Sequence, residues 1–468
     1  MDPTAQIRSA DDAARYLDGL INRERTSDDA RARTRFDLSA IRALLDAVGN
    51  PERQLSILHV AGSKGKGSVC LAAECVLRAL GERVGTFTSP HLERWTERFR
   101  IDGREVSGEA LARAVTRLRP HVEALRRDRP ETAPSFFDAT TAAALLLFAE
   151  AGVDRVLLEV GLGGRLDSTN AVTPQVTCVT QIELEHTQIL GDTLSAIASE
   201  KAGILKAGIP CVVGALAPEA DAVVRARAAE LGSPVFALGE HFDLVVEPAG
   251  GGRVATRLRY RERTGFEVDL ELPVVGRHQA RNVGLALACV RRLEAHDDAA
   301  LRASAIDGLS RLELPGRIEW IEPVERGAPR VVIDCAHTAA SASGLAEALT
   351  ELGIQGADFV LSVSQGKALE GILRPLVPLA RRITLTRADP DRTLAPARLL
   401  EAIRVLAPDL AVRTEDDPAA AVRLALADAS PADEPGTVVV TGSVYLVGIA
   451  RQIVRAADAA GSAPSAPE

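Results

Sequence analysis

Short, almost continuously apolar runs alternate with amphipathic helical patterns along most of the chain. Near the N-terminus, residues Ala10–Val48 predict two amphipathic helices around a charged connector, Asn22–Arg33. The run Leu55–Ala61 then leads through a Gly-rich turn into a helical pattern at Val69–Leu80. Further strand candidates are Val84–Thr88, Arg155–Val160, Val176–Ile182 and Pro210–Gly214, and further helical patterns are Gly108–Arg127, Ala139–Ala151 and Gln279–Glu294. Strands that are apolar on both faces and alternate with helices indicate an α/β fold with a mostly parallel sheet.

The pattern changes twice in the second half of the chain. Residues Phe242–Leu272 alternate apolar and polar positions, which predicts an antiparallel meander or edge ribbon with a turn at Gly250–Gly252. A break near Leu314-Pro315-Gly316 begins a second α/β series. Its strand candidates are Val331–Ile333, Phe359–Ser362, Ile383–Thr386 and Val438–Val440. We therefore expect one domain over residues 1–312, a smaller one over 313–458, and a disordered Ala/Ser/Pro-rich tail over 459–468.

Composition narrows the class of protein. Of the 468 residues, 46% are hydrophobic and 25% are charged, as in an ordinary globular enzyme. The net charge of -9 and the absence of a basic cluster argue against a nucleic-acid partner. No apolar stretch is long enough to span a membrane, and the polar N-terminus has no signal-peptide core, so we expect a cytoplasmic protein without a membrane partner. The six cysteines have no paired spacing and are expected to be free thiols.

The turn after the first strand candidate has the composition of a phosphate-binding loop. It reads Gly62, Ser63, Lys64, Gly65, Lys66, Gly67 and Ser68, between a strand and a helix. Glycines let backbone N–H groups face an anion, and the helix N-terminus adds partial positive charge. Lys66 would reach the β- and γ-phosphates, and Ser68 a phosphate or magnesium. Because Val60 stands where the general motif has its first glycine, a Gly-rich turn with solvent-facing lysines is the alternative.

Several blocks of the sequence resemble, in order and spacing, the folylpolyglutamate synthase/dihydrofolate synthase family of the Mur ligase superfamily. They are His59–Ser68, Thr88–Leu92, Leu158–Asn170, His186–Lys206, Gly276–Asn282, Pro315–Arg317, Asp334–His337 and Thr441–Val447, within a resemblance that spans residues 40–451. Several short blocks in one order are more specific than any single motif.

The resemblance implies a Mur ligase central-type domain that contains the phosphate loop, followed by a Rossmann-like α/β domain. It implies an ATP-dependent, ADP-forming ligase that uses Mg²⁺ and joins L-glutamate to a dihydropteroate or reduced-folate carboxylate. A carboxylate needs a good leaving group before an amine can replace it. Phosphorylation by ATP supplies one as an acyl phosphate, and the chemistry is then mostly positioning and charge neutralisation. We expect a monomer.

The resemblance also assigns metal-binding residues. Glu159 ends an apolar strand, where a carboxylate can face a ligand, and its family counterpart binds magnesium. Ser89 and His186 match the family's other metal positions, and Lys201 matches a carbamylated lysine. The structural alternatives are a strand-end salt bridge for Glu159, a capping or core histidine for His186, and a surface lysine for Lys201.

Four further positions match the family's nucleotide and amino-acid residues. Asn282 corresponds to an adenine-side asparagine and Arg317 to a phosphate-side arginine. Asp334 and His337 follow a strand of the second domain and would face ATP and the amino acid, although an Asp-x-x-His pair alone is more often a strand-end cap. The resemblance thus gives Lys66, Lys201, Arg317 and His337 as catalytic residues.

Some positions depart from the family pattern and keep alternatives open. Thr338-Ala339 replaces an Asn-Pro, and Ser364–Lys367 replaces an acidic-lysine-acidic run. These changes favour, as a second hypothesis, a Mur-superfamily ligase for a different acid or amino acid. A catalytically inactive nucleotide-binding regulator is a third. A hydride-transfer enzyme comes last, because the Gly-rich run at Gly161 lacks its final glycine. Residues 136–138 fit either a pterin-side region or core packing.

Overall fold

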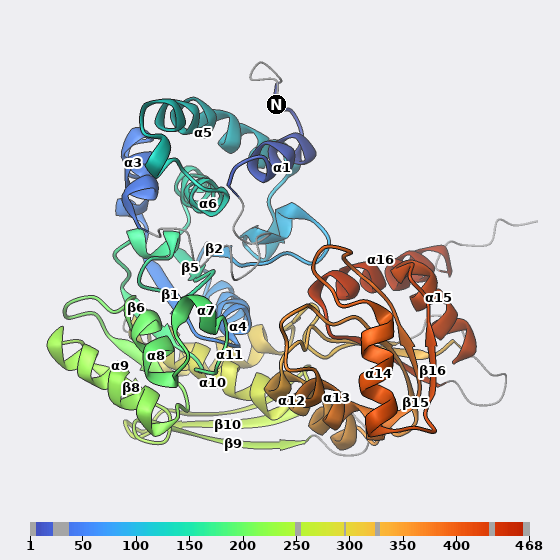
Figure 1. Cartoon of the computed structure of the whole chain (residues 1–468). Coiled ribbons are helices and arrows are strands. Elements are labelled where there is room, and N and C mark those ends of the chain that lie inside the picture. Colours follow the sequence, from blue (N-terminus) through green and yellow to red (C-terminus); the bar gives the residue numbers. More distant parts are fainter. Residues whose placement is uncertain are drawn as a thin grey trace, which may run out of the picture. The chain divides into compact units, whose positions relative to one another are not determined.

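The computed structural model describes residues 6–21, 37–248, 254–293, 296–322, 328–429 and 436–461 (Figure 1). The chain divides into two compact units. The first comprises Met1–Val245, Leu258–Leu270 and Arg281–Leu312, and the second comprises Val246–Arg257, Glu271–Ala280 and Glu313–Glu468. The two early segments of the second unit fall within the predicted first domain, whose boundary near residue 312 stays a prediction.

An eight-stranded sheet forms the centre of the first unit, in the order β4-β3-β2-β5-β1-β6-β7-β8. Its strands are β1 (Ile57–Ala61), β2 (Val84–Phe87), β3 (Phe99–Ile101), β4 (Arg104–Glu105), β5 (Arg155–Glu159), β6 (Val176–Val179), β7 (Cys211–Val213) and β8 (Val235–Ala237). All neighbours pair in parallel except β2–β3 and β3–β4. Every residue of β1, β5 and β6 is buried, as the apolar runs predict. Full burial of one Val, Leu or Ile contributes about 1.5–3 kcal/mol.

Helices cover this sheet. They are α1 (Ala10–Asp18), α3 (Ser39–Ala47), α4 (Lys66–Ala79), α5 (Gly108–Asp128), α6 (Phe136–Ala151), α7 (Thr187–Leu190), α8 (Leu194–Ala202), α9 (Pro218–Glu230), α10 (Arg277–Leu293) and α11 (Asp298–Leu309). Figure 1 shows α6 surrounded by α1, α3 and α5, and these four helices share a core with Ile57, Val156 and Leu158 of the sheet. Helix α4 packs on β1, β2 and β5, and α11 packs on α4. Helices α8 and α9 share a second core with β6 and β7.

Three strands form a separate sheet in the order β11-β10-β9: β9 (Phe242–Pro248), β10 (Thr256–Glu262) and β11 (Glu267–Leu272). Strand β10 alternates buried and exposed residues along its whole length, and β11 does the same. This agrees with the ribbon predicted from the alternating sequence pattern. The turn expected at Gly250–Gly252 and the connector at 22–33 lie outside the described residues.

The second unit contains a six-stranded sheet in the order β12-β13-β17-β14-β15-β16, parallel except for β12–β13. Its strands are β12 (Glu319–Ile321), β13 (Arg330–Ile333), β14 (Ala357–Leu361), β15 (Ala380–Leu385), β16 (Ala411–Thr414) and β17 (Thr437–Thr441). Its helices are α12 (Ala339–Glu351), α13 (Leu369–Leu376), α14 (Pro396–Leu406), α15 (Pro418–Asp428) and α16 (Val444–Gly461). The core of this unit also includes Val275, which precedes residue 312.

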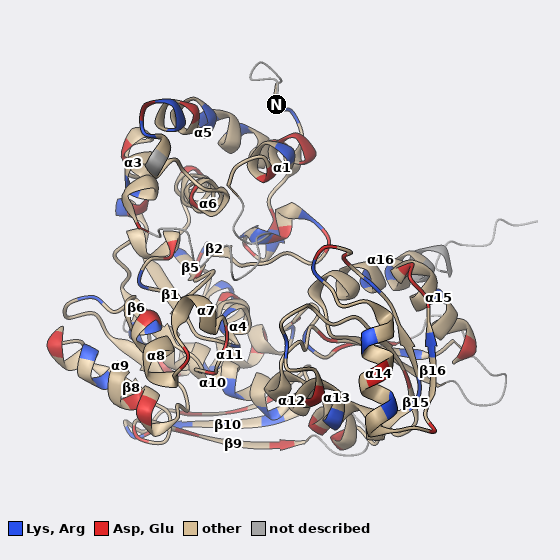
Figure 2. Ribbon diagram, viewed as in Figure 1, with Lys and Arg blue, Asp and Glu red and all other residues tan. Residues whose placement is uncertain are grey.

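Two differences from the sequence prediction concern short or terminal elements. Strands β3, β4, β8, β12 and β16 were not predicted, because two to four residues carry too little periodicity. Helix α16 continues to Gly461, so the first three residues of the predicted disordered tail are helical, and 462–468 lie outside the described residues. Arg residues are interspersed with Asp and Glu along helices such as α5 and α9 (Figure 2). Within the described ranges, none of the helices is long and apolar enough to cross a membrane.

Candidate active site

The predicted phosphate loop joins β1 to α4, at the carboxyl end of the sheet's central strand. Gly65 precedes the helix with a φ of 82°, and a Cβ atom there would lie 2.3 Å from Oδ1 of Asn282. A Cβ atom on Gly62 would lie 1.8 Å from Oγ1 of Thr180. The loop therefore needs glycine at both positions, and Asn282 of α10 lies against it, while the predicted adenine-side role of Asn282 stays a prediction. Lys66 Nζ donates to the Gly62 carbonyl at 3.1 Å, across the mouth of the loop.

Other residues of the loop anchor it to the segment after β6. The Ser63 amide donates to the carbonyl of Gln181 at 2.6 Å, and the Glu183 amide donates to Ser63 Oγ at 3.0 Å. The Thr180 hydroxyl donates to the Lys64 carbonyl at 2.6 Å. Ser63 thus has a structural role, and the first turn of α4 with Lys66 and buried Ser68 is the part suited to an anion.

A buried carboxylate lies beside this helix N-terminus. Glu159, at the end of β5, is 6% exposed, and its Oε2 accepts from the Ser89 amide at 3.0 Å. A Cβ atom on Gly67 would lie 3.2 Å from the same oxygen. Glu159, Ser89 and the first turn of α4 therefore converge. In the part of the chain that the structure describes, no group of three or more His, Cys, Asp or Glu side chains is arranged to hold a metal. Magnesium needs no such group, because it commonly binds one or two carboxylates together with substrate phosphates.

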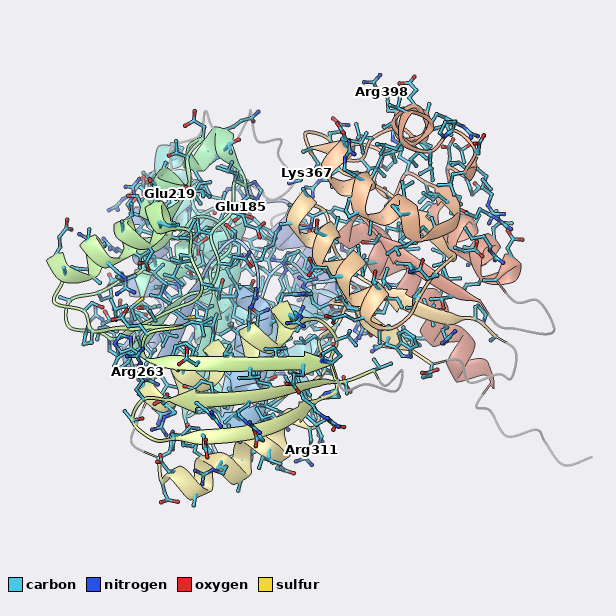
Figure 3. All side chains as sticks on the ribbon, turned by 90° about the horizontal axis from the view of Figure 1, so that it is seen from below. Glu185, Glu219, Arg263, Arg311, Lys367 and Arg398 are labelled. Atoms are coloured by element: carbon cyan, nitrogen blue, oxygen red, sulfur yellow. The ribbon has the colours of Figure 1, made fainter. Side chains whose placement is uncertain are left out.

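Lys201 is buried in α8, so the surface-lysine alternative is wrong. Its Nζ donates to Oε1 of Glu185 at 3.0 Å, and Lys64 Nζ lies 4.0 Å from Oε2 of the same carboxylate. Burial lowers the pKa of Lys201 despite the opposing effect of Glu185. Burial would raise the pKa of Glu185, but Lys201, Lys66 and Lys64 together lower it to about 2. Figure 3 labels Glu185, which the sequence analysis did not assign to the site.

His186, the residue just before α7, has a φ of 45° and lines a cavity of about 220 Å³. The cavity is lined by Asp37, Ser135, Phe137, Asp138, Gly161, Leu162, Gly163, Arg165, Leu166, Asp167, Ser168, His186, Ile189, Leu190 and Glu200. Of residues 136–138, Phe136 belongs to the hydrophobic core, and Phe137 and Asp138 line this cavity, so the pterin-side interpretation stays a prediction. Part of the cavity lining lies close to Glu159 in the sequence, because Gly161 is two residues beyond the end of β5.

The Gly-rich run after β5 packs against the helix that carries Lys201. A Cβ atom on Gly164 would lie 2.8 Å from the Glu200 carbonyl oxygen. Asn170 Nδ2 donates to the carbonyl of Gly203 at 3.1 Å, and Arg165 pairs with Glu200 at 2.8 Å. These glycines and polar groups hold the loop on α8. In the sequence, the small residues after a strand indicate that this loop can approach another group closely. They do not indicate which helix the loop contacts.

The predicted residues of the second unit meet at the ends of β12 and β13. Asp334 accepts from the amides of Ile318 and Ala336, both at 2.8 Å, which ties the Arg317 loop to the loop after β13. His337 Nδ1 lies 2.8 Å from the Cys335 carbonyl, so this nitrogen carries a hydrogen and donates it. Arg317 donates to the Gly316 carbonyl at 3.0 Å, and burial, against the opposing effect of Arg317, raises the pKa of Cys335 to about 11.

A larger hollow of about 600 Å³ lies at the opposite end of the strands. Leu55, just before β1, and Gln175, just before β6, line it together with Arg42, Leu45, Asp46, Asn50, Glu52, Arg53, Ala171 and Thr173. No predicted site residue lines it. In open α/β sheets ligands bind outside the carboxyl ends of the strands, and the smaller cavity lies at that end.

A loop that fits phosphate, with a strand-end carboxylate beside it, defines a nucleotide-dependent enzyme of the α/β class, and comparison with known proteins narrows this class. The Mur ligase middle domain matches residues 60–290, and the Mur ligase, glutamate ligase domain matches 316–444. The folylpolyglutamate synthase of Lacticaseibacillus casei is 34% identical over 89% of this chain and 94% of its own.

Solved structures agree. Mycobacterium tuberculosis folylpolyglutamate synthase, complexed with ADP and AMPPCP, has a TM-score of 0.81 and 33% identity over 92% of this chain and 96% of its own. E. coli FolC, in complex with DHPP and ADP, has a TM-score of 0.81 and 29% identity over 97% of this chain and 99% of its own. The chain belongs to the folylpolyglutamate synthase/dihydrofolate synthase family of the Mur ligase superfamily. It is an ATP-dependent, ADP-forming ligase that joins glutamate to folate. The hydride-transfer and regulator alternatives do not agree with this finding.

Proposed function

We propose that the enzyme uses Mg²⁺ with ATP, and that dihydropteroate or a reduced folate is the acceptor that L-glutamate extends. The observation that carries this proposal is the convergence of Glu159 and Ser89 on the first turn of α4 beside Lys66. A nucleotide phosphate on that turn would meet backbone N–H groups, a lysine and a carboxylate suited to a hard cation. The complexes of the relatives with ADP, AMPPCP and DHPP support the same ligands.

Glu159 and Ser89 would hold the magnesium ion, with His186 as the third predicted position. Held there, the ion would neutralise charge on the phosphates and orient them. Lys66 then offsets charge on the transferred phosphoryl group. The acceptor carboxylate attacks the γ-phosphorus to give an acyl phosphate and ADP, and the glutamate amine displaces phosphate.

Lys201 is the proposed site of carbamylation. An uncharged lysine amine adds to carbon dioxide with loss of one proton, which gives an anionic carbamate. Burial lowers the pKa of Lys201 and so favours the uncharged amine that this step needs. Lys64 lies 4.0 Å from the partner carboxylate of Lys201 and could offset part of the added negative charge.

Arg317, Asp334 and His337 are proposed for the ATP and amino-acid side of the reaction. Asp334 holds the Arg317 loop in place through its two backbone contacts, and Arg317 offsets phosphoryl charge. Thr338 caps α12 in a capping box with Ser341. Asparagine, which the family has at this position, is an equally good N-cap, so the alternative of a different amino acid stays open. The monomeric state and cytoplasmic location also stay predictions.

The test is phosphate release from ATP by the purified enzyme with magnesium, comparing dihydropteroate, tetrahydrofolate and no acceptor, each with and without glutamate. We expect release that depends on acceptor and glutamate, with a product heavier by one glutamyl unit. Lys66→Ala should lower kcat by about 10²–10³, as removal of one transition-state charge contact does. ATP binding without turnover on either acceptor would overturn the folate assignment and direct the search to other acids and amines.

A further inference from the structure

His59 is a fully buried histidine on the central strand β1, outside the residues assigned to catalysis. Its Nε2 lies 2.9 Å from Oγ1 of Thr169. The Thr169 hydroxyl donates its only hydrogen to Oδ1 of Asp167, so its oxygen must accept from the imidazole. His59 is therefore the Nε2–H tautomer. Burial, with a smaller effect of Lys206, lowers the pKa of His59 to about 3 and keeps the ring neutral.

Asp167, which accepts the hydrogen bond from Thr169, also holds the turn that lines the smaller cavity. Its Oδ2 accepts from the Leu162 amide at 2.8 Å, and its Oδ1 also accepts from the Thr169 amide at 3.0 Å. Gly161, Leu162 and Asp167 all line the cavity. The same turn begins two residues after Glu159. A continuous series of hydrogen bonds thus runs from the centre of the sheet to the cavity wall.

We propose that His59 and Thr169 are positioning residues that fix Asp167 and the Gly161–Leu162 turn, and so set the shape of the acceptor cavity. The proposal rests on the proposed function for the folate-type acceptor, and it places that acceptor in the smaller cavity because the lining begins two residues after Glu159, at the carboxyl end of the strands. Neither side chain lines the cavity, and both act through Asp167. A purely structural role would predict lower stability without a selective effect on the acceptor.

Thr169→Val removes the hydroxyl at nearly constant volume, and Thr169→Ser retains it. The matched control is Thr177→Val. Thr177 is also fully buried and pairs with His59 in the β1–β6 register, but its hydroxyl donates to the Pro210 carbonyl at 3.3 Å, away from the cavity lining. We expect Thr169→Val to raise the acceptor KM about tenfold, the size of one lost buried hydrogen bond, and to leave the ATP KM unchanged. Thr169→Ser and Thr177→Val should keep the wild-type acceptor KM.

A second readout needs no turnover. Hydrogen exchange of the Leu162 amide in the ligand-free enzyme should accelerate in Thr169→Val and in His59→Leu. It should stay at the wild-type rate in Thr177→Val and recover in His59→Gln, whose amide reaches the Nε2 position. Unchanged exchange in Thr169→Val, or equal increases in the acceptor and ATP KM, would overturn the proposal. If the wild-type enzyme extends neither folate acceptor, the proposed function fails, while the exchange rates still decide the role of His59 and Thr169.

Discussion

The buried imidazole of His59 makes the stability of the protein depend on pH. In the unfolded chain its pKa is near the ordinary value of 6.5, whereas in the folded protein it is about 3. Below pH 6.5 the unfolded state binds a proton that the folded state does not. The contribution of the neutral His59 to the free energy of unfolding is therefore complete above pH 6.5. As the pH falls from 6.5 toward 3, this free energy decreases by up to about 1.4 kcal/mol per pH unit.

His59→Gln lacks this titration, so the difference in unfolding free energy between wild type and variant should shrink as the pH falls. Urea denaturation at pH 7.5, 6.5, 5.5 and 4.5 measures this difference directly. Parallel pH curves for the two proteins would show that His59 is already protonated in the folded state, or that it is not buried as the structure places it.

His59 and Lys201 differ in how far their roles could be predicted from the sequence. Lys201 could be predicted only through the family resemblance, because its local pattern fits a helix-end surface lysine equally well. Its burial and its pairing with Glu185 depend on contacts between α8 and the loop after β6. His59 lies inside the block that carried the resemblance, but within an apolar strand its position indicates core packing. Only its contact with Thr169, 110 residues away, connects it to the site.

At the scale of elements, the connection from β1 to α4 was predicted closely. The apolar run, the glycines and the helical pattern each indicate a local conformation, so the prediction needed no distant contacts. The helix begins at Lys66 rather than at the predicted Val69, because the positive φ of Gly65 ends the loop and the next three residues are already helical. The short strands β3 and β4 were missed, since they are stabilised by pairing with β2 rather than by their own pattern.

Gly65→Ala should damage nucleotide binding. The new Cβ atom would lie 2.3 Å from Asn282 Oδ1, and alanine at a φ of 82° adds backbone strain. Such strain costs about 1–3 kcal/mol, and the loop would have to move to relieve it. If the same free energy is lost from ATP binding, the ATP KM rises about ten- to a hundredfold. Gly81, just after the same helix, has a φ of 88°, and a Cβ atom added there would meet nothing within 4 Å, which makes it the matched control.

Gly81→Ala should lower the unfolding free energy by about 1–2 kcal/mol through its backbone conformation while the ATP KM stays at the wild-type value. The two quantities are read from urea denaturation and from steady-state kinetics with saturating acceptor. An equal rise in ATP KM in both variants would mean that strain anywhere at the ends of α4, and not the contact with Asn282, controls nucleotide binding.

For the whole molecule, the sequence predicts two α/β series. It does not predict to which compact unit each part of the three-stranded ribbon belongs. Each strand from β9 to β11 has residues in both compact units. Alternating burial predicts a ribbon, yet it carries no information on which unit each end of a strand joins. That assignment depends on long-range packing, such as the place of Val275 in a core whose other buried members begin at Ile318.

The division of the chain leads to a prediction for a fragment of residues 313–461. Such a fragment contains the whole six-stranded sheet but lacks Val246–Arg257 and Glu271–Ala280, which belong to the same compact unit. It loses Val275, which is 3% exposed in the core and contributes about 1.5–3 kcal/mol. Because a domain is stable by only about 5–15 kcal/mol, we expect the fragment to unfold at lower urea concentration, and less cooperatively, than the intact chain. Near-ultraviolet circular dichroism and urea denaturation measure this. A fragment with the same midpoint and a steep single transition would instead support an independent domain that begins at residue 313.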